Sequence, residues 1–257
     1  MLTIKNYARP QSLKEAYELL MKKKSNVVLG GMVWLKMQNK TVDTAIDLQD
    51  LELDQIEETN TAWKIGAMVS LRDLELHPGL HSLTGGAMAE SLKHIVGVQF
   101  RNTATIGGSL YGRFGFSDVL TLFLALDAKV DLFHRGIVSL EEFCRMPRRE
   151  RDLLIRVLIP KAPRKVSYLA QRNCATDFPV LTCAVAKTQQ ETLCVVGARP
   201  GKAVCLHHMP DDPGEAAAAA AEQLGFGSNV RGSADYRRQI CRVLVRRAMT
   251  ALQAQED

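Results

Sequence analysis

The sequence predicts an α+β protein in which two small subdomains are followed by a C-terminal domain of antiparallel strands and helices. Three observations support this class. A helical pattern and short β-branched strands occupy the first 55 residues, and alternating strands mixed with capped helices follow. After Pro160, the basic segment Lys161–Lys165 separates these from three strands and two helices. We therefore predict a first domain at 1–164, with subdomains at about 1–55 and 56–164, and a second domain at 165–257.

The first subdomain opens with a predicted helix over Pro10–Lys24. Ser12 has the side chain of an N-cap, and Glu15 follows three residues later as its capping-box partner. A strand is predicted at Asn26–Leu29, and it ends in the pair Gly30-Gly31.

The apolar segment Met32–Met37 is expected to begin a helix directly after this glycine pair. A strand, a glycine turn and a helix start together expose backbone N–H donors, which is an arrangement that binds anionic groups. Thr44–Leu48 is predicted as the next strand of a parallel type of sheet, and Gln49–Asp54 as a turn.

The second subdomain alternates strands with capped helices. Its predicted strands are Trp63–Met68, Lys129–Phe133, Gly136–Ser139 and Leu153–Pro160, of which the middle two form a hairpin. Its predicted helices start at Ser70 and Ser139 and cover Ala87–Val96 and Asp118–Asp127. In the C-terminal domain we predict antiparallel strands at Val166–Gln171, Leu181–Thr188 and Leu193–Gly197 and helices at Gly214–Leu224 and Ser233–Gln253.

The segment between residues 102 and 118 carries the strongest binding signal. Thr103–Ser109 is a run of small residues around Gly107-Gly108, and Asp118 stands nine residues after Ser109. Glycines let backbone N–H groups approach phosphate oxygens, and a carboxylate accepts hydrogen bonds from sugar hydroxyls. By itself a glycine pair also fits a tight turn.

Composition excludes several classes of function. The net charge is +5 and the pI about 8.9, but the basic residues are dispersed without a nucleic-acid-binding motif, so we expect no nucleic-acid partner. The six cysteines lack C-x-x-C spacing, so we expect reduced thiols and no metal site. With neither a signal-peptide pattern nor an apolar stretch of 18 residues, we expect a cytoplasmic protein without a membrane segment. No pattern of catalytic side chains emerges.

Four segments together resemble one family over nearly the whole chain. They are the glycine segment Val27–Trp34, the glycine segment Ala104–Ser109 with Ser117-Asp118, the strands within Tyr168–Ala184, and Arg231–Arg238. They resemble the FAD-binding medium subunit of the molybdenum hydroxylases, as in xanthine dehydrogenase and carbon monoxide dehydrogenase. That resemblance implies a flavin domain of the p-cresol methylhydroxylase type with FAD as cofactor.

The resemblance also implies the binding residues. Backbone N–H groups of 28–34 and 107–109 would cradle the FAD pyrophosphate, and Asp118 would bind ribose or flavin-side hydroxyls. The implied contact residues are Val27, Val28, Leu29, Gly30, Gly31, Met32, Val33, Trp34, Ile95, Thr105, Ile106, Gly107, Gly108, Ser109, Ser117, Asp118, Leu154, Leu169 and Arg172. Implied partners are an iron–sulfur subunit and a molybdenum-cofactor subunit, with NAD or another molecule as electron acceptor.

Four positions depart from the family pattern. Met32, Val33 and Ser109 replace residues with more hydrogen-bonding capacity, and Leu169 stands where many members have a lysine near the flavin, which would leave that role to Arg172. These departures favour a second hypothesis, in which the chain is a docking or assembly subunit without redox work. A third hypothesis is a free-standing FAD oxidase, but the sequence has no histidine or cysteine motif for covalent flavin attachment.

Overall fold

The chain folds into two compact units, and segments of the two units alternate along the sequence. In the computed structural model, which describes residues 1–254, unit 1 comprises 1–73, 98–112 and 128–160. Unit 2 comprises 74–97, 113–127 and the chain from Lys161 onward. Each unit therefore assembles from segments far apart in sequence.

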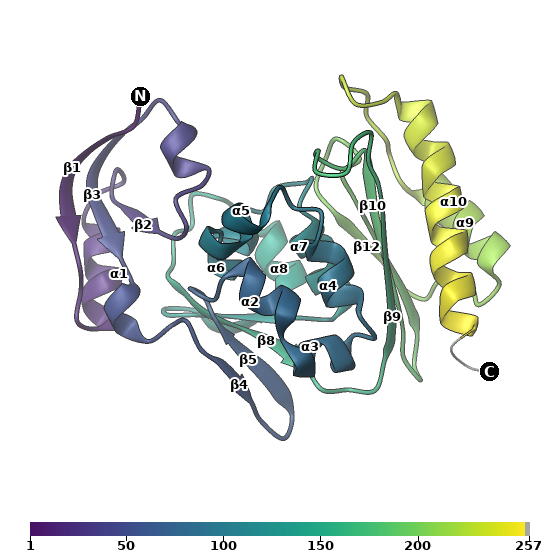
Figure 1. Cartoon of the computed structure of the whole chain (residues 1–257), viewed down its shortest axis with the longest axis horizontal. Coiled ribbons are helices and arrows are strands. Elements are labelled where there is room, and N and C mark those ends of the chain that lie inside the picture. The colour runs from purple at the N-terminus through teal and green to yellow at the C-terminus, as the bar shows by residue number, and fades with distance from the viewer. Residues whose placement is uncertain (255–257) are drawn as a thin grey trace. The chain divides into compact units, whose positions relative to one another are not determined.

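Unit 1 begins with a three-stranded parallel sheet and one helix (Figure 1). The sheet has the order β1-β3-β2, with β1 at Thr3–Ala8, β2 at Val27–Leu29 and β3 at Thr41–Asp47, and the helix α1 spans Leu13–Lys22. Ala16 and Leu20 of α1 are buried with Ile46 and Leu48, so the apolar face of the helix covers the sheet.

The remainder of unit 1 is built on a five-stranded antiparallel sheet of order β4-β5-β8-β6-β7. Its strands are β4 (Ile56–Glu58), β5 (Ala62–Gly66), β6 (Lys129–Leu132), β7 (Gly136–Ser139) and β8 (Leu154–Pro160). Its helices are α5 (Val98–Thr103), α6 (Ile106–Tyr111), α8 (Leu140–Arg145) and the 3₁₀ turns η1 (Leu35–Met37) and η2 (Gln49–Leu51). The helix α2 (Leu71–Leu76) begins in unit 1 and ends in unit 2.

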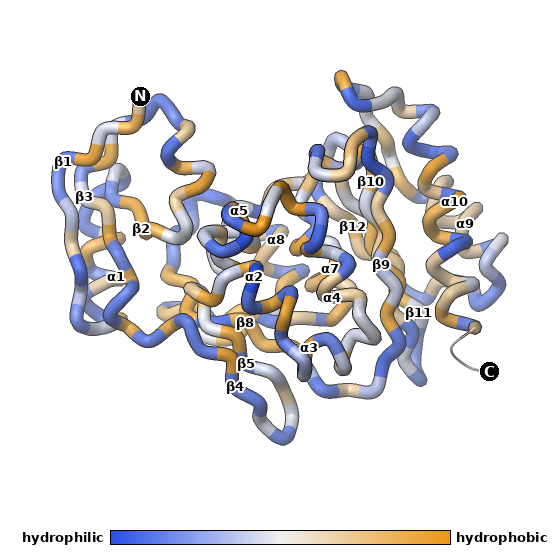
Figure 2. The backbone as a smooth tube through the Cα atoms, in the orientation of Figure 1, coloured by the Kyte–Doolittle hydropathy of each residue, from blue (hydrophilic) through white to orange (hydrophobic). Residues whose placement is uncertain are grey.

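Unit 2 contains a four-stranded antiparallel sheet of order β12-β11-β10-β9. Its strands are β9 (Lys165–Gln171), β10 (Leu181–Lys187), β11 (Thr192–Gly197) and β12 (Val204–Leu206). Its helices are α3 (Pro78–Leu83), α4 (Ala87–Leu92), α7 (Asp118–Ala125), α9 (Pro213–Gln223) and α10 (Ala234–Gln253). In Figure 2, hydrophobic residues recur along β9, β10 and α10, and residues of these three elements pack into one hydrophobic core.

Helices cover both faces of this sheet, which explains why every residue of β10 except Lys187 is buried. Cys183 packs in the core below α9 and α10, whereas the hydroxyl of its neighbour Thr182 lies 2.8 Å from that of Thr121 on α7. On β9, Leu169 pairs with Cys183 and faces the α10 side. Tyr168 faces the α7 side, because successive side chains of a strand point to opposite faces.

The structure bears out most of the predicted elements. Ser12, Ser117, Ser139 and Ser233 cap helices through their hydroxyl oxygens, although Glu15 accepts from the N–H of Gln11 rather than from that of Ser12. The sequence did not indicate β1, β4, β12, α3, α5 or α6.

Two local predictions were wrong. The helix expected over Met32–Met37 is a single 3₁₀ turn, because Met32 has a left-handed backbone (φ 54°) that cannot continue a helix. The pair Gly107-Gly108 lies in neither a loop nor a tight turn, because both residues belong to α6 after the N-cap Thr105.

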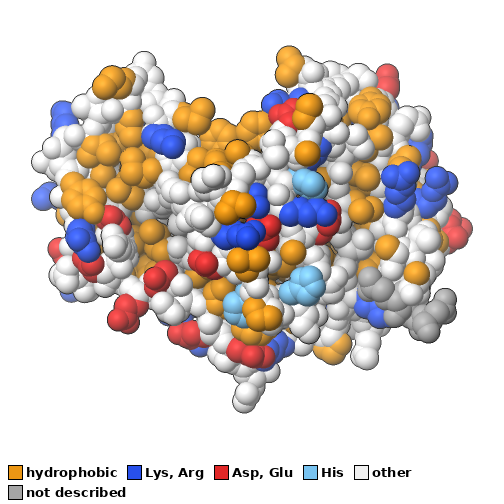
Figure 3. Space-filling view, viewed as in Figure 1, with side chains coloured by type: hydrophobic (Ala, Val, Ile, Leu, Met, Phe, Trp, Pro, Cys, Tyr) orange, Lys and Arg blue, Asp and Glu red, His pale blue; other side chains and the backbone are white. Residues whose placement is uncertain are grey.

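Surface and thiol chemistry are simple. No helix among residues 1–254 combines the length and hydrophobicity needed to cross a membrane. None of the six cysteines, all of which lie within residues 1–254, forms a disulfide. On the face drawn in Figure 3, Lys and Arg side chains gather over α10.

Candidate cofactor-binding site

The loop after β2 offers backbone donors at the surface of unit 1. Gly31, Met32 and Val33 are partly exposed, and within residues 1–254 their N–H groups have no hydrogen-bond acceptor. Met32 has a left-handed backbone and Trp34 a right-handed one, so the main chain changes hand within this loop, as it does in anion-binding loops of backbone N–H groups. This loop can therefore bind an anion such as a phosphate through its main chain.

Close backbone packing explains the glycines of this loop. A Cβ on Gly31 would lie 1.8 Å from the carbonyl oxygen of Thr103, so no side chain fits there. A Cβ on Gly30 would lie 2.8 Å from the Thr105 hydroxyl and 3.7 Å from the Cα of Gly108. The two glycine segments, which are far apart in sequence, are therefore in contact within unit 1.

The second segment has a different role from the expected one. Gly107 donates its N–H to the carbonyl of Ala67, Gly108 to the Thr105 hydroxyl, and Ser109 to the Thr105 carbonyl. The Ser109 hydroxyl also donates to that carbonyl, at 2.9 Å. Because these donors are all used within unit 1, we correct the expectation that the N–H groups of 107–109 cradle a phosphate.

Gly108 nevertheless leaves room for a ligand. It is exposed, and a Cβ added to it would meet only the Thr105 hydroxyl, at 3.2 Å, within 4 Å. A ligand held by the N–H groups of the first loop can thus approach the main chain of Gly108. The observed geometry fits a phosphate-bearing cofactor, with donors from one segment and a bare backbone surface from the other.

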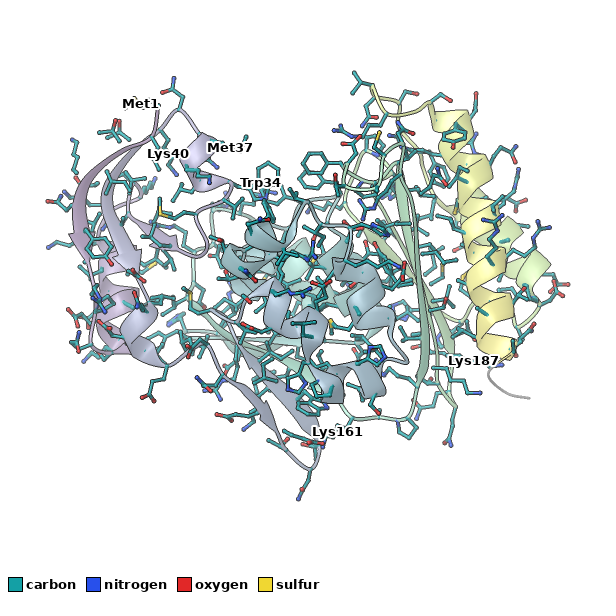
Figure 4. All side chains as sticks on the ribbon, in the orientation of Figure 1. Met1, Trp34, Met37, Lys40, Lys161 and Lys187 are labelled. Atoms are coloured by element: carbon teal, nitrogen blue, oxygen red, sulfur yellow. The ribbon has the colours of Figure 1, made fainter. Side chains whose placement is uncertain are left out.

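The remaining expected residues of unit 1 lie on β2, α6, β8 and the turn η1. Val27, Val28 and Leu29 form β2, Ile106 is buried in α6, and Leu154 is the buried first residue of β8. Trp34 and Met37 lie on the turn that follows the glycine loop (Figure 4), and Trp34 is 38 % exposed.

In unit 2 the expected residues Asp118 and Arg172 form a buried ion pair. Their side chains are only 7 % and 8 % exposed, and the hydroxyl of Tyr168 donates to the same Asp118 oxygen at 2.5 Å. Burial raises the pKa of Asp118, which Arg172 and Tyr168 partly oppose, and burial together with Asp118 raises the pKa of Tyr168 well above its usual value. The pair places an ionised carboxylate at the start of α7, where a helix stabilises negative charge.

The arginine of this pair has one unused donor. The Nη1 of Arg172 donates to the carbonyl of Asp177 at 2.7 Å, and its Nη2 binds Asp118, but its buried Nε has no hydrogen-bond partner among residues 1–254. Arg172 also lines a pocket of about 270 Å³, and the residues around it are Glu90, His94, Tyr168, Ala170, Gln171, Arg172, Asn173, Cys174 and Ala175. Unit 2 thus has a polar pocket with a cationic wall.

Three other expected residues of unit 2 take separate places. Ser117 is the N-cap of α7, and its hydroxyl accepts from the N–H of Leu120. Ile95 lies in the turn after α4. Leu169 packs against the core below α9 and α10, on the face of the sheet opposite Tyr168.

The sequence interpretation missed Tyr168, Asp177 and Arg231 as members of the Asp118 network. The alternation along β9 was the available signal for Tyr168, because a residue adjacent to the inward-facing Leu169 must point to the other face. Asp177 contacts Arg172 within one loop, whereas Arg231 contacts Asp177 from 54 positions away in sequence, so for Arg231 no local signal exists.

Comparison of the chain with known proteins identifies its family. Residues 2–162 match the family described as "FAD binding domain in molybdopterin dehydrogenase". The chain is 32% identical to "Uncharacterized protein YgfM" of Escherichia coli strain K12, over 94% of both chains. It is 25% identical to the nicotine 6-hydroxylase medium subunit of Paenarthrobacter nicotinovorans, over 95% of both.

A solved structure agrees in fold. A chain of the reconstituted CO dehydrogenase from Oligotropha carboxidovorans superimposes with a TM-score of 0.87 at 24% identity and covers 98% of each chain. The predicted α+β class, the family resemblance and the FAD cofactor are therefore confirmed. The chain belongs to the family of FAD-binding domains of molybdopterin dehydrogenases.

Proposed function

We propose that this chain is the FAD-binding, electron-transferring subunit of a multi-subunit molybdenum hydroxylase. The N–H groups of Gly31, Met32 and Val33, which directly follow the Gly30 that lies next to Gly108, carry the proposal. In this role they hold the FAD pyrophosphate through the main chain, so the unusual side chains at 32 and 33 do not prevent binding. The Trp34 side chain lies beside the adenosine part.

In unit 2, we propose that Asp118 binds a hydroxyl of the cofactor and that Arg172 stabilises negative charge. Leu169 packs away from the Asp118 face, so Arg172 is the cation of unit 2 that the sequence offers in place of the family's lysine. FAD, when bound, accepts single electrons and releases them in pairs, which suits a chain placed between one-electron and two-electron carriers. Ile95, Ser117 and Leu154 complete the proposed contacts.

The proposed partners are an iron–sulfur subunit as electron donor and a molybdenum subunit that oxidises the organic substrate. Support comes from the relative named as a medium subunit, of which this chain covers 95%. No group of three or more His, Cys, Asp or Glu that could hold a metal occurs among the described residues, and substrate oxidation is accordingly assigned to partner chains. NAD is the proposed final acceptor, in the cytoplasm.

The experiment is equilibrium dialysis of the purified chain with FAD and, separately, with riboflavin. FAD should bind at micromolar concentration and give a flavin absorbance spectrum, while riboflavin, which lacks phosphate, should bind at least about 100-fold more weakly because two charge-assisted hydrogen bonds are lost. Equal binding of both flavins would contradict a phosphate role for the loop.

A second function is supported by a specific observation. The Ser109 hydroxyl and the N–H groups of 107–109 are used within unit 1, which reduces the number of donors left for a cofactor. This favours a docking subunit that keeps the fold without redox work. Under that function FAD leaves the melting temperature unchanged, whereas saturation at 100 times Kd should stabilise a flavoprotein by about 2.7 kcal/mol.

A further inference from the structure

The segment of residues 229–232 holds the loop between β9 and β10 at both of its ends. The carbonyl of Arg231 accepts a hydrogen bond from the Asn173 Nδ2 at 3.3 Å, where the loop begins. Its guanidinium binds the Asp177 carboxylate at 3.2 Å and lies 4.9 Å from the centre of the Phe178 ring, where the loop ends. A single residue thus contacts both ends of the loop.

Asp177 connects this contact to the buried ion pair. Its carboxylate accepts from the N–H of Phe178 at 2.7 Å as well as from Arg231, which fixes the orientation of the peptide that follows it. Its own carbonyl accepts from Nη1 of Arg172, whose Nη2 binds Asp118. Movement of Asp177 would therefore turn the guanidinium of Arg172 and displace its contact with Asp118.

A second arginine, Arg237, holds the backbone segment that carries Arg231. Arg237 of α10 is fully buried and donates to the carbonyls of Val180 and Gly227 at 2.9 and 2.8 Å and to that of Gly232. It also donates to the Asn229 side-chain oxygen, which accepts the N–H of Arg231. Because Arg237 binds four acceptors, two of them in the segment 229–232, it fixes the backbone from which the Arg231 side chain extends to the loop.

We infer that Arg231 is a positioning residue that orients Arg172 and Asp118 toward the cofactor through Asp177. The inference rests on the proposed FAD-binding function and adds a residue to it. Within residues 1–254 the guanidinium of Arg231 pairs with Asp177 and not with Arg172 or Asp118. A guanidinium is needed because its planar fork meets the Asp177 carboxylate while its face meets the Phe178 ring.

The first test measures the loop without any cofactor. Hydrogen exchange of residues 172–180 should be faster in Arg231→Gln than in the wild type, and Arg231→Lys should restore only part of the protection. Arg238→Gln is the matched control from the helix α10 that follows this segment, since Arg238 pairs with Asp235 and contacts Phe226 outside this network. Unchanged exchange in Arg231→Gln would overturn the inference, whatever the chain does with FAD.

The second test measures FAD dissociation constants for Arg231→Gln, Asp177→Asn and the double variant. We expect each single substitution to weaken binding about three- to tenfold, as for the loss of a partly exposed ion pair, and the double variant to be no weaker than either. Additive losses, or wild-type affinity in Arg231→Gln, would contradict action through Asp177. Absence of FAD binding by the wild type would instead refute the proposed function.

Discussion

The buried pair of Asp118 and Arg172 is the residue-scale feature with the largest consequence for stability. Both side chains are more than nine-tenths buried, and each supplies the other's counter-charge. Taking two charges out of water is costly, so the pair is sustained by its further hydrogen bonds from Tyr168 and to Asp177. Such a pair specifies geometry more than it adds stability.

Replacing Arg172 by leucine should lower the free energy of unfolding by about 3–5 kcal/mol at neutral pH, because Asp118 is left charged and buried. The double variant with Asp118→Asn should recover part of the loss, since a neutral amide is cheaper to bury. Urea unfolding measures both, with Arg238→Gln, 42 % exposed, as a control that changes stability by less than about 1 kcal/mol. A double variant less stable than Arg172→Leu would contradict this account.

Asp177 should make folding sensitive to acid. The N–H of Phe178 and then Arg231 lower its pKa below the usual 3.8, so the folded state binds this proton less readily than the unfolded chain. Its stabilising contribution is present above that usual value and is lost as the pH falls through the folded-state pKa. Melting temperatures measured from about pH 5 down to about pH 2 should therefore fall less steeply in Asp177→Asn than in the wild type.

The control for that titration is Asp235→Asn, whose side chain is 93% exposed and pairs only with Arg238 among its described neighbours. It should follow the wild-type curve. An acid limb as steep in Asp177→Asn as in the wild type would show that Asp177 is not a source of the acid sensitivity.

At the scale of elements, the β2 loop and α6 use glycine for two different purposes. Gly31 allows the loop to pack on the backbone before α6, and Gly107 allows α6 to pack on Ala67, where a Cβ would lie 2.6 Å from the Ala67 carbonyl oxygen. Gly108 has no such backbone neighbour. Packing therefore explains Gly31 and Gly107, while Gly108 is left for the ligand.

Alanine substitutions at Gly31 and Gly108 should separate an effect on folding from an effect on cofactor binding. Gly31→Ala should cost about 3 kcal/mol of stability or prevent folding, because the new methyl group overlaps the Thr103 carbonyl. Gly108→Ala should change the stability of the cofactor-free chain by less than about 1 kcal/mol, since alanine favours the helix, yet it should weaken FAD binding. Thermal unfolding and FAD titration measure the two effects, and unimpaired FAD binding in Gly108→Ala would remove Gly108 from the site.

At the scale of the whole molecule, the units do not follow the sequence in order. The predicted domain boundary at residue 164 stays a prediction. Unit 2 contains the chain after that position and also residues 74–97 and 113–127, which precede it. The helices α4 and α7 from those segments cover the face of the β9–β12 sheet that carries Tyr168 and Thr182.

A fragment of residues 165–257 should therefore not fold alone. Without α4 and α7 it exposes one face of β10, which is buried on both faces in the full chain. Amide NMR of the fragment should show the narrow dispersion of an unfolded chain, compared with wide dispersion for the full chain. A well-dispersed spectrum from the fragment would show that the α9 and α10 face suffices.

The sequence by itself determined the local structure and the family. Strand alternation and serine caps were sufficient for the α+β class, because these signals depend on neighbouring residues, whereas FAD was implied by the resemblance of four segments to the family. The tertiary structure alone decided that Gly30 meets Gly108, that the Ala67 carbonyl takes the N–H of Gly107, and that Arg231 reaches Asp177. The last of these contacts joins residues 54 positions apart in sequence, and only the packing of the whole fold fixes such distances.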